Sequence, residues 1–214
     1  MKRLCVLCIV AVVLCAADAV QAASSTRDQA LKALDHPDAT TRIEGVERLG
    51  VIGRAADADR LMRRLGDADP EVRAAATDAI WQIWSRSGDA AIDKLFARGV
   101  EHMQGQMFEE ALTVFNQIVA RKPAFAEGWN KRATVRFMRK DFAGSIADCQ
   151  ETLARNPNHF GASSGQGLCH MSLGEYREAA VCFRRAQDIH PHLDAVRYNL
   201  ALAEAEGGGS GYLH

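Results

Sequence analysis

Small, apolar and proline positions recur at a fixed spacing along the second half of the chain. Pro123, Pro157 and Pro191 are equally spaced, and their separation defines a 34-residue step. Four further sets of positions follow the same step: Gly99, Ala133, Gly167 and Ala201; Ala111, Ser145 and Ala179; Phe108, Phe142 and Tyr176; Phe115, Cys149 and Phe183. Five sets that share one period indicate an internal structural repeat.

Each set has a physical role in a pair of antiparallel helices. Two helices cross closely only where small side chains meet, and two of the sets are small. We expect Phe115 and Phe183 to fill the remaining space, packing from the second helix of a pair toward the next pair. Each proline ends a second helix, because proline lacks the backbone N–H that a helix needs. The pattern predicts three helix pairs over residues 91–193.

This pattern resembles the tetratricopeptide repeat, a helix pair of about 34 residues. The resemblance implies an all-α helical-repeat solenoid, in which residues 194–205 form one further first helix that covers the last open face. Unit two departs from the family at Ser145 and Cys149, where an alanine and an apolar or aromatic residue are preferred. Unit three contains Gly161 and Gly165, and each glycine within a helix costs about 1 kcal/mol relative to alanine. Its first helix is expected to be the loosest element.

The first half carries a different repeat, whose positions recur with a 31-residue offset. Asp38 aligns with Asp69, and Arg42 aligns with Arg73. An aspartate before a helix caps free amide groups, and the arginine one turn later can bridge toward a neighbouring acidic cap. Helices are predicted near Thr40–Val51, Ala55–Leu65 and Pro70–Trp84, with Gly53 and Gly66 as helix ends.

This second pattern resembles the short HEAT-type repeat of phycobilin-lyase-related proteins, over about residues 26–86. The predicted organisation has four parts. They are a signal peptide (1–22), HEAT-like repeats (23–88), a tetratricopeptide array with its capping helix (89–206) and a flexible tail (207–214).

The amino-terminal residues have the pattern of a secretory signal peptide. Lys2 and Arg3 precede an apolar run over residues 4–17, and the small side chains of Val20 and Ala22 follow. This order predicts cleavage after Ala22 and a periplasmic or secreted protein without stable membrane insertion. An uncleaved signal anchor is the alternative.

Charge and cysteine content narrow the function further. Removing residues 1–22 takes away two of the 26 basic and one of the 27 acidic residues, which gives a formal net charge of −2. A nearly neutral protein has no general attraction to nucleic acid. Cys149, Cys169 and Cys182 are the cysteines beyond residue 22. Cys149 and Cys169 are expected to face each other, either as a disulfide or as two buried free thiols.

The sequence offers little that resembles a motif of catalysis or cofactor binding. It has no His-Glu-x-x-His helix or Gly-Lys-Ser phosphate loop, and beyond residue 22 it has no Cys-x-x-Cys pair. The stretch at residues 161–165 has the Gly-x-Ser-x-Gly spacing, but it sits in register with a repeat helix. His159, His190 and His192 lie near unit ends and are interpreted as solvated loop residues rather than metal ligands. We therefore expect no enzymatic activity, no cofactor and no metal.

The inner row of first-helix side chains is the candidate binding site. The resemblance places it on a concave groove that binds extended or helical peptides. Relatives that clamp carboxylate tails use Lys, Arg and Asn there, whereas this chain has Val100, Thr134 and Gly161, leaving Asn130 and Lys131 as polar anchors. The row comprises Phe96, Val100, Met103, Asn130, Thr134, Phe137, Ser164, Leu168, Met171, Tyr198 and Leu202.

Taken together, the sequence predicts an exported scaffold that binds a partner protein or peptide through this row. The alternatives are a structural module of an envelope complex and a lyase-like accessory protein with a small ligand in a deep pocket. Coverage of the row by the capping helix or by the HEAT-like segment is also open at this point.

Overall fold

The computed structural model describes residues 26–209, and every regular element in that range is a helix. The chain divides into two compact units, Met1–Ile83 and Trp84–His214. The division falls earlier than the predicted boundary after Gly88. Within residues 26–209, the helices are too short or too polar to span a membrane. The predicted signal peptide lies outside the described residues and stays a prediction.

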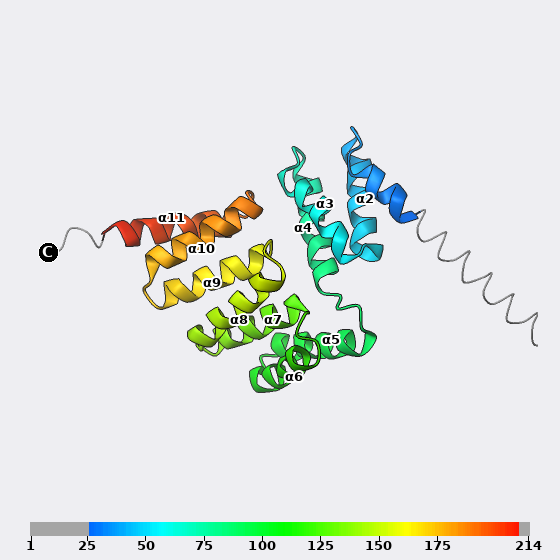
Figure 1. The fold of residues 1–214 in the computed structure, drawn as a ribbon. Coiled ribbons are helices and arrows are strands. Elements are labelled where there is room, and N and C mark those ends of the chain that lie inside the picture. Colours follow the sequence, from blue (N-terminus) through cyan, green and yellow to red (C-terminus); the bar gives the residue numbers. More distant parts are fainter. Residues whose placement is uncertain (1–25, 210–214) are drawn as a thin grey trace, which may run out of the picture. The chain divides into compact units, whose positions relative to one another are not determined.

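The first unit is built from short helices (Figure 1). Residues 26–33 are helical, and α2 (Ala39–Ile52), α3 (Ala58–Met62) and α4 (Pro70–Trp84) follow. The helix expected over residues 55–65 is broken, because 3-10 turns at Ala55–Asp57 and Arg63–Gly66 flank α3. Gly53 ends α2 as predicted, and Gly66 is the last residue of the second 3-10 turn.

The predicted caps of the first unit are confirmed. The Asp38 carboxylate accepts a hydrogen bond of 2.8 Å from the Thr41 N–H at the start of α2. Asp69 accepts one of 2.8 Å from the Glu71 N–H at the start of α4. Arg42 reaches the carboxylate of Asp67, just before the second cap, at 2.8 Å. The 31-residue repeat therefore fixes both helix starts and joins them.

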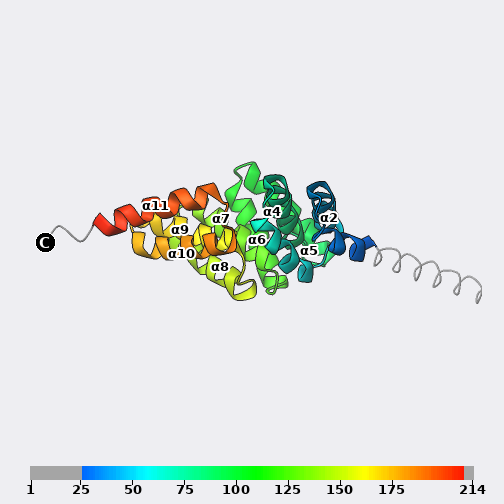
Figure 2. The ribbon, with the colours of Figure 1, turned by 90° about the horizontal axis from the view of Figure 1, so that it is seen from above.

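The second unit is a stack of antiparallel helix pairs, and in both views α11 lies beside α10 at its end (Figures 1 and 2). Each predicted proline lies two residues beyond the end of a second helix. Helix α11 extends to Gly209, so the expected tail from residue 207 and the helix end at 205 were wrong. The helices are α5 (Ala90–Gln104), α6 (Phe108–Arg121), α7 (Ala126–Met138), α8 (Phe142–Arg155), α9 (Phe160–Ser172), α10 (Tyr176–Ile189) and α11 (Asp194–Gly209).

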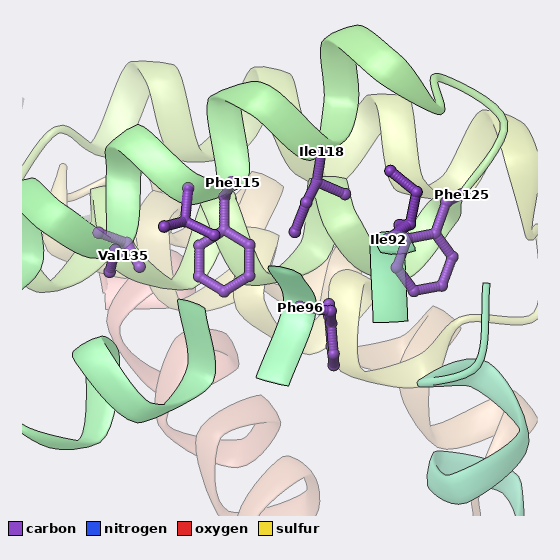
Figure 3. Close-up of a cluster of buried hydrophobic side chains, with 8 residues drawn as sticks. Ile92, Phe96, Phe115, Ile118, Phe125 and Val135 are labelled. Atoms are coloured by element: carbon purple, nitrogen blue, oxygen red, sulfur yellow. The ribbon is translucent and has the colours of Figure 1, made fainter. Parts of the chain in front are cut away.

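The first helix pair closes over a cluster of buried side chains (Figure 3). A Cβ atom added to Gly99 would lie 2.8 Å from the ring of Phe115, so these two helices approach as closely as glycine allows. Phe115 thus packs onto the first helix of its own pair, and it also shares a cluster with Phe125 and Val135 of the next pair, toward which it was expected to pack. The cluster is Ile92, Phe96, Ala111, Val114, Phe115, Ile118, Phe125 and Val135.

The second helix pair forms the same crossing with a smaller and more polar set of residues. Ala133 stands in place of the glycine, and Cys149 stands in place of the phenylalanine. The first helix therefore contributes a larger side chain to the contact, and the second helix contributes a smaller one. Ser145 replaces the alanine, and its hydroxyl donates a 2.8 Å hydrogen bond to the Ala133 carbonyl. The buried hydroxyl is thereby satisfied. These departures from the repeat pattern keep the fold intact.

A buried ion pair accompanies these departures. Asp148 stands where the other units have Val114 and Cys182. Its carboxylate accepts two hydrogen bonds from Arg132, at 2.8 and 2.7 Å. Arg136 adds a third contact at 3.1 Å. A carboxylate is tolerated in this apolar set because α7 supplies two guanidinium groups against it.

Candidate functional site

The predicted row is contributed by the first helices α5, α7 and α9 and by α11. Its exposure increases toward the carboxyl end of the unit, where Tyr198 is 70% and Leu202 37% exposed. The first-helix face is the name we give to Tyr198 and Leu202 together with the half-buried members of the row. The half-buried members are Val100, Met103, Thr134, Phe137, Ser164, Leu168 and Met171.

Two members of the row differ from the expectation. Phe96 is buried, and its ring lies 5.4 Å from that of Phe125 and 6.0 Å from that of Phe115. Asn130 is buried as well. A helix in a stack is covered on several sides, so the helical period alone does not identify the side that stays open. Phe96 and Asn130 support the fold rather than offering surface.

The half-buried apolar members of the row support the fold and also offer part of their surface. Val100 and Met103 pack against the cluster around Phe115, and Leu168 and Met171 pack against the core between α10 and α11. Each therefore presents only part of its side chain. Met138, the last residue of α7, follows Phe137 in the chain and is 53% exposed. It was not predicted from the sequence.

The two expected polar anchors serve another residue. The Asn130 side-chain amide donates to Glu127 Oε2 at 3.1 Å, and Lys131 Nζ lies 3.1 Å from Glu127 Oε1. Because both groups are engaged by this carboxylate, they are not free cationic or amide anchors for a ligand.

Glu127 is also held by His159, which the sequence reading took for a solvated residue. His159 is 0% exposed, and its Nε2 lies 2.8 Å from Glu127 Oε2. The Ala162 N–H donates to His159 Nδ1 at 2.9 Å, so this histidine caps α9. Since Nδ1 accepts, Nε2 carries the proton that is donated to Glu127. The ring of Trp84 stacks on His159 with centroids 4.4 Å apart.

The charge state of Glu127 follows from these partners. Burial by itself would raise the pKa of Glu127. The hydrogen bond from His159 and the ammonium group of Lys131 outweigh burial, and they lower the pKa below its ordinary value of 4.5. The carboxylate is therefore ionised at neutral pH and ties α7 to the start of α9.

A signal for this cluster was present in the repeat. His159 follows Phe125 and precedes Leu193 at the 34-residue step, and Phe125 is buried. A histidine in an otherwise apolar set is expected to be buried and paired. His190 is buried too, which corrects its interpretation as solvated, whereas His192 is exposed as expected.

The three cysteines beyond residue 22 are free thiols in the structure. Cys149 and Cys169 are buried, and burial raises the pKa of both thiols. Among the described residues 26–209, no group of three His, Cys, Asp or Glu side chains is arranged to hold a metal ion.

Comparison with known proteins identifies the second unit. Residues 96–160 and 149–194 match the family model of the tetratricopeptide repeat. Residues 96–194 of the chain carry tetratricopeptide (TPR) repeats. The all-α solenoid predicted from the sequence is confirmed. The likeness to the HEAT-type repeat, in contrast, stays a prediction.

Two curated relatives carry the same repeat. A TPR repeat-containing protein of Rhizobium etli is 30% identical over 134 residues, which cover 62% of this chain and 66% of the relative. The small glutamine-rich tetratricopeptide repeat-containing protein of Dictyostelium discoideum is 30% identical over 122 residues, covering 56% of this chain and 36% of the relative. The matches thus span less than two thirds of each relative's length.

Solved structures show the same TPR fold at low sequence identity. The first TPR of Spaghetti (RPAP3) bound to the HSP90 peptide SRMEEVD has a TM-score of 0.54 and 20% identity, covering 55% of this chain and 93% of that one. The MamA protein has a TM-score of 0.53 and 19% identity, covering 72% and 84%.

Proposed function

We propose that this protein is an exported, non-catalytic scaffold that holds an apolar segment of a partner protein on its first-helix face. The observation that carries the proposal is the exposure of Tyr198, Leu202 and Met138 on first helices of the stack. Large apolar side chains left in water mark an interaction surface where they line one face. The half-buried apolar members between them extend that surface along the unit.

The charge of the face favours an apolar segment over an acidic tail. A TPR neighbour holds the peptide SRMEEVD, which ends in acidic residues. In this chain Lys131 is paired with Glu127, and Val100 and Thr134 occupy neighbouring positions. Since Glu127 engages Lys131, the face gains binding free energy mainly from apolar burial. Methionines such as Met138 and Met171 adapt to varied apolar side chains.

Truncating Tyr198 is expected to weaken binding by about 2 kcal/mol, roughly 30-fold in Kd, because exposed aromatic residues dominate such interfaces. The probe is the tightest peptide selected from a random library on residues 23–214, with Kd measured by calorimetry. Val181→Ala is the matched control, since Val181 is 62% exposed on the second helix α10. Weaker binding by Val181→Ala, with Tyr198→Ala unchanged, would place the site elsewhere. Failure to select any peptide would favour a structural module.

Export rests on the amino-terminal pattern and has its own test. The secreted or periplasmic form is expected to begin at Ala23, because the basic, apolar and small segments before it form a signal. Intact-mass measurement of the protein from its native compartment checks this. A mass that still includes Met1–Ala22 contradicts cleavage and supports a signal anchor.

A further inference from the structure

The first unit repeats a hydrogen-bond pattern as well as a sequence. Arg42 Nη1 donates to the backbone carbonyls of residues 36 and 37, at 3.0 and 2.9 Å. Arg73 Nη1 donates to those of residues 67 and 68, at 2.7 and 3.0 Å. Every partner in the second set is the counterpart of one in the first set under the 31-residue repeat. Each guanidinium group therefore donates through its own Nη1 to the backbone carbonyls at the same two positions of the repeat.

The other edge of the Arg42 guanidinium carries a carboxylate. Nε donates to Asp67 Oδ2 at 3.0 Å, and Nη2 donates to Asp67 Oδ1 at 2.8 Å. The Asp67 side chain is nearly buried, and although burial opposes ionisation, these hydrogen bonds lower its pKa below the ordinary value. Two parallel N–H···O bonds give such a pair both strength and a fixed geometry.

The same edge of Arg73 has no carboxylate. Among the described residues of the first unit, 26–83, Arg73 Nε and Nη2 have no hydrogen-bond acceptor within reach, although the side chain is half-buried. The next position equivalent to Asp67 in the 31-residue repeat is Arg98, so the repeat supplies no second acid. The nearest cap, Asp69, is occupied by the N–H groups of Glu71 and Val72.

We propose that the Nε–Nη2 edge of Arg73 binds a carboxylate side chain of a partner protein, in the position that Asp67 takes toward Arg42. The carbonyls of residues 67 and 68 orient the guanidinium before binding. Preorganisation lowers the entropic cost of forming the pair. The planar fork of arginine selects a carboxylate over a single-point acceptor. This site belongs to the first unit and is separate from the first-helix face.

Side-chain NMR of the two arginines tests the site within one molecule. Sodium acetate is added to 15N-labelled residues 23–214 while sodium chloride keeps the ionic strength constant. The Nε–H signal of Arg73 is expected to shift and saturate, whereas that of Arg42 stays unchanged because Asp67 already occupies its fork. Equal shifts at both arginines, or no shift of Arg73 beyond that seen with chloride, overturn the proposal.

A peptide distinguishes a partner side chain from a free anion. The probe is the heptapeptide of residues 65–71, Leu-Gly-Asp-Ala-Asp-Pro-Glu, which contains the acid that Arg42 binds. Its control has asparagine in place of the first aspartate. The control peptide is expected to bind the wild-type protein several-fold more weakly than the first peptide does. The first peptide is also expected to bind Arg73→Lys several-fold more weakly, because lysine keeps the charge but lacks the planar fork of arginine. If acetate shifts the Arg73 signal but the two peptides bind equally, the partner-protein part of the proposal fails.

Discussion

Replacing Glu127 with alanine is expected to lower the free energy of unfolding of the second unit by about 3 kcal/mol. The change leaves the buried Nε2–H of His159 and the side-chain amide of Asn130 without their acceptor. An unsatisfied buried donor costs about 1–3 kcal/mol, and removing one partner of a buried ion pair costs about 3–5 kcal/mol. Urea denaturation of residues 23–214, followed by the fluorescence of Trp81, Trp84 and Trp129, measures the loss.

The pH dependence separates the charge of Glu127 from its shape. Because its folded-state pKa lies below the ordinary value of 4.5, the carboxylate stabilises the fold fully above that value. The contribution is lost as pH falls through the folded-state pKa. Glu127→Gln is nearly isosteric, so it should be less stable than wild type at neutral pH and approach wild type below pH 4.5. A difference that is constant with pH would mean that the charge contributes nothing.

Gly167→Ala is expected to destabilise the unit by up to about 3 kcal/mol. The added Cβ would lie 2.7–2.9 Å from three atoms of the Phe183 ring, which is fully buried and has no room to move. Gly165→Ala, two residues earlier in α9, is the matched control. Its Cβ would lie 3.6 Å from Cys149 Sγ, an ordinary contact. That change should stabilise α9 by up to about 1 kcal/mol through helix propensity.

Opposite signs for these two alanines are the decisive result, and thermal or urea unfolding of both variants provides it. Two changes of the same sign would mean that helix propensity, rather than the contact with Phe183, governs α9. Adding Phe183→Leu to Gly167→Ala tests the contact directly. The double variant should lose less stability than the sum of the single changes, because the smaller side chain makes room for the Cβ.

Much of the fold was readable from the sequence because it rests on short-range physics. Proline lacks an N–H, so residues 123, 157 and 191 had to follow helix ends, and they do. Asp38 and Asp69 cap helices within three residues of themselves. The small and aromatic sets predicted the helix crossings, which the contact between Gly99 and Phe115 confirms.

The candidate site was only partly predictable, since its members depend on which sides of each helix are covered. Phe96 and Tyr198 stand at equivalent positions of the 34-residue repeat, yet Phe96 is buried and Tyr198 is exposed. The difference arises because Phe125, at the start of the next helix, packs on Phe96. The period places both residues in one row but contains no information about the neighbouring helix.

The sequence by itself determined the repeat and the helix ends. Only the tertiary structure decided the polar pairs that join helices, namely Glu127 with His159, Arg132 with Asp148 and Arg42 with Asp67. The partners are 16 to 32 residues apart, so no local rule couples them. A charge in an apolar set needs a partner, and packing alone determines which side chain is close enough to provide it.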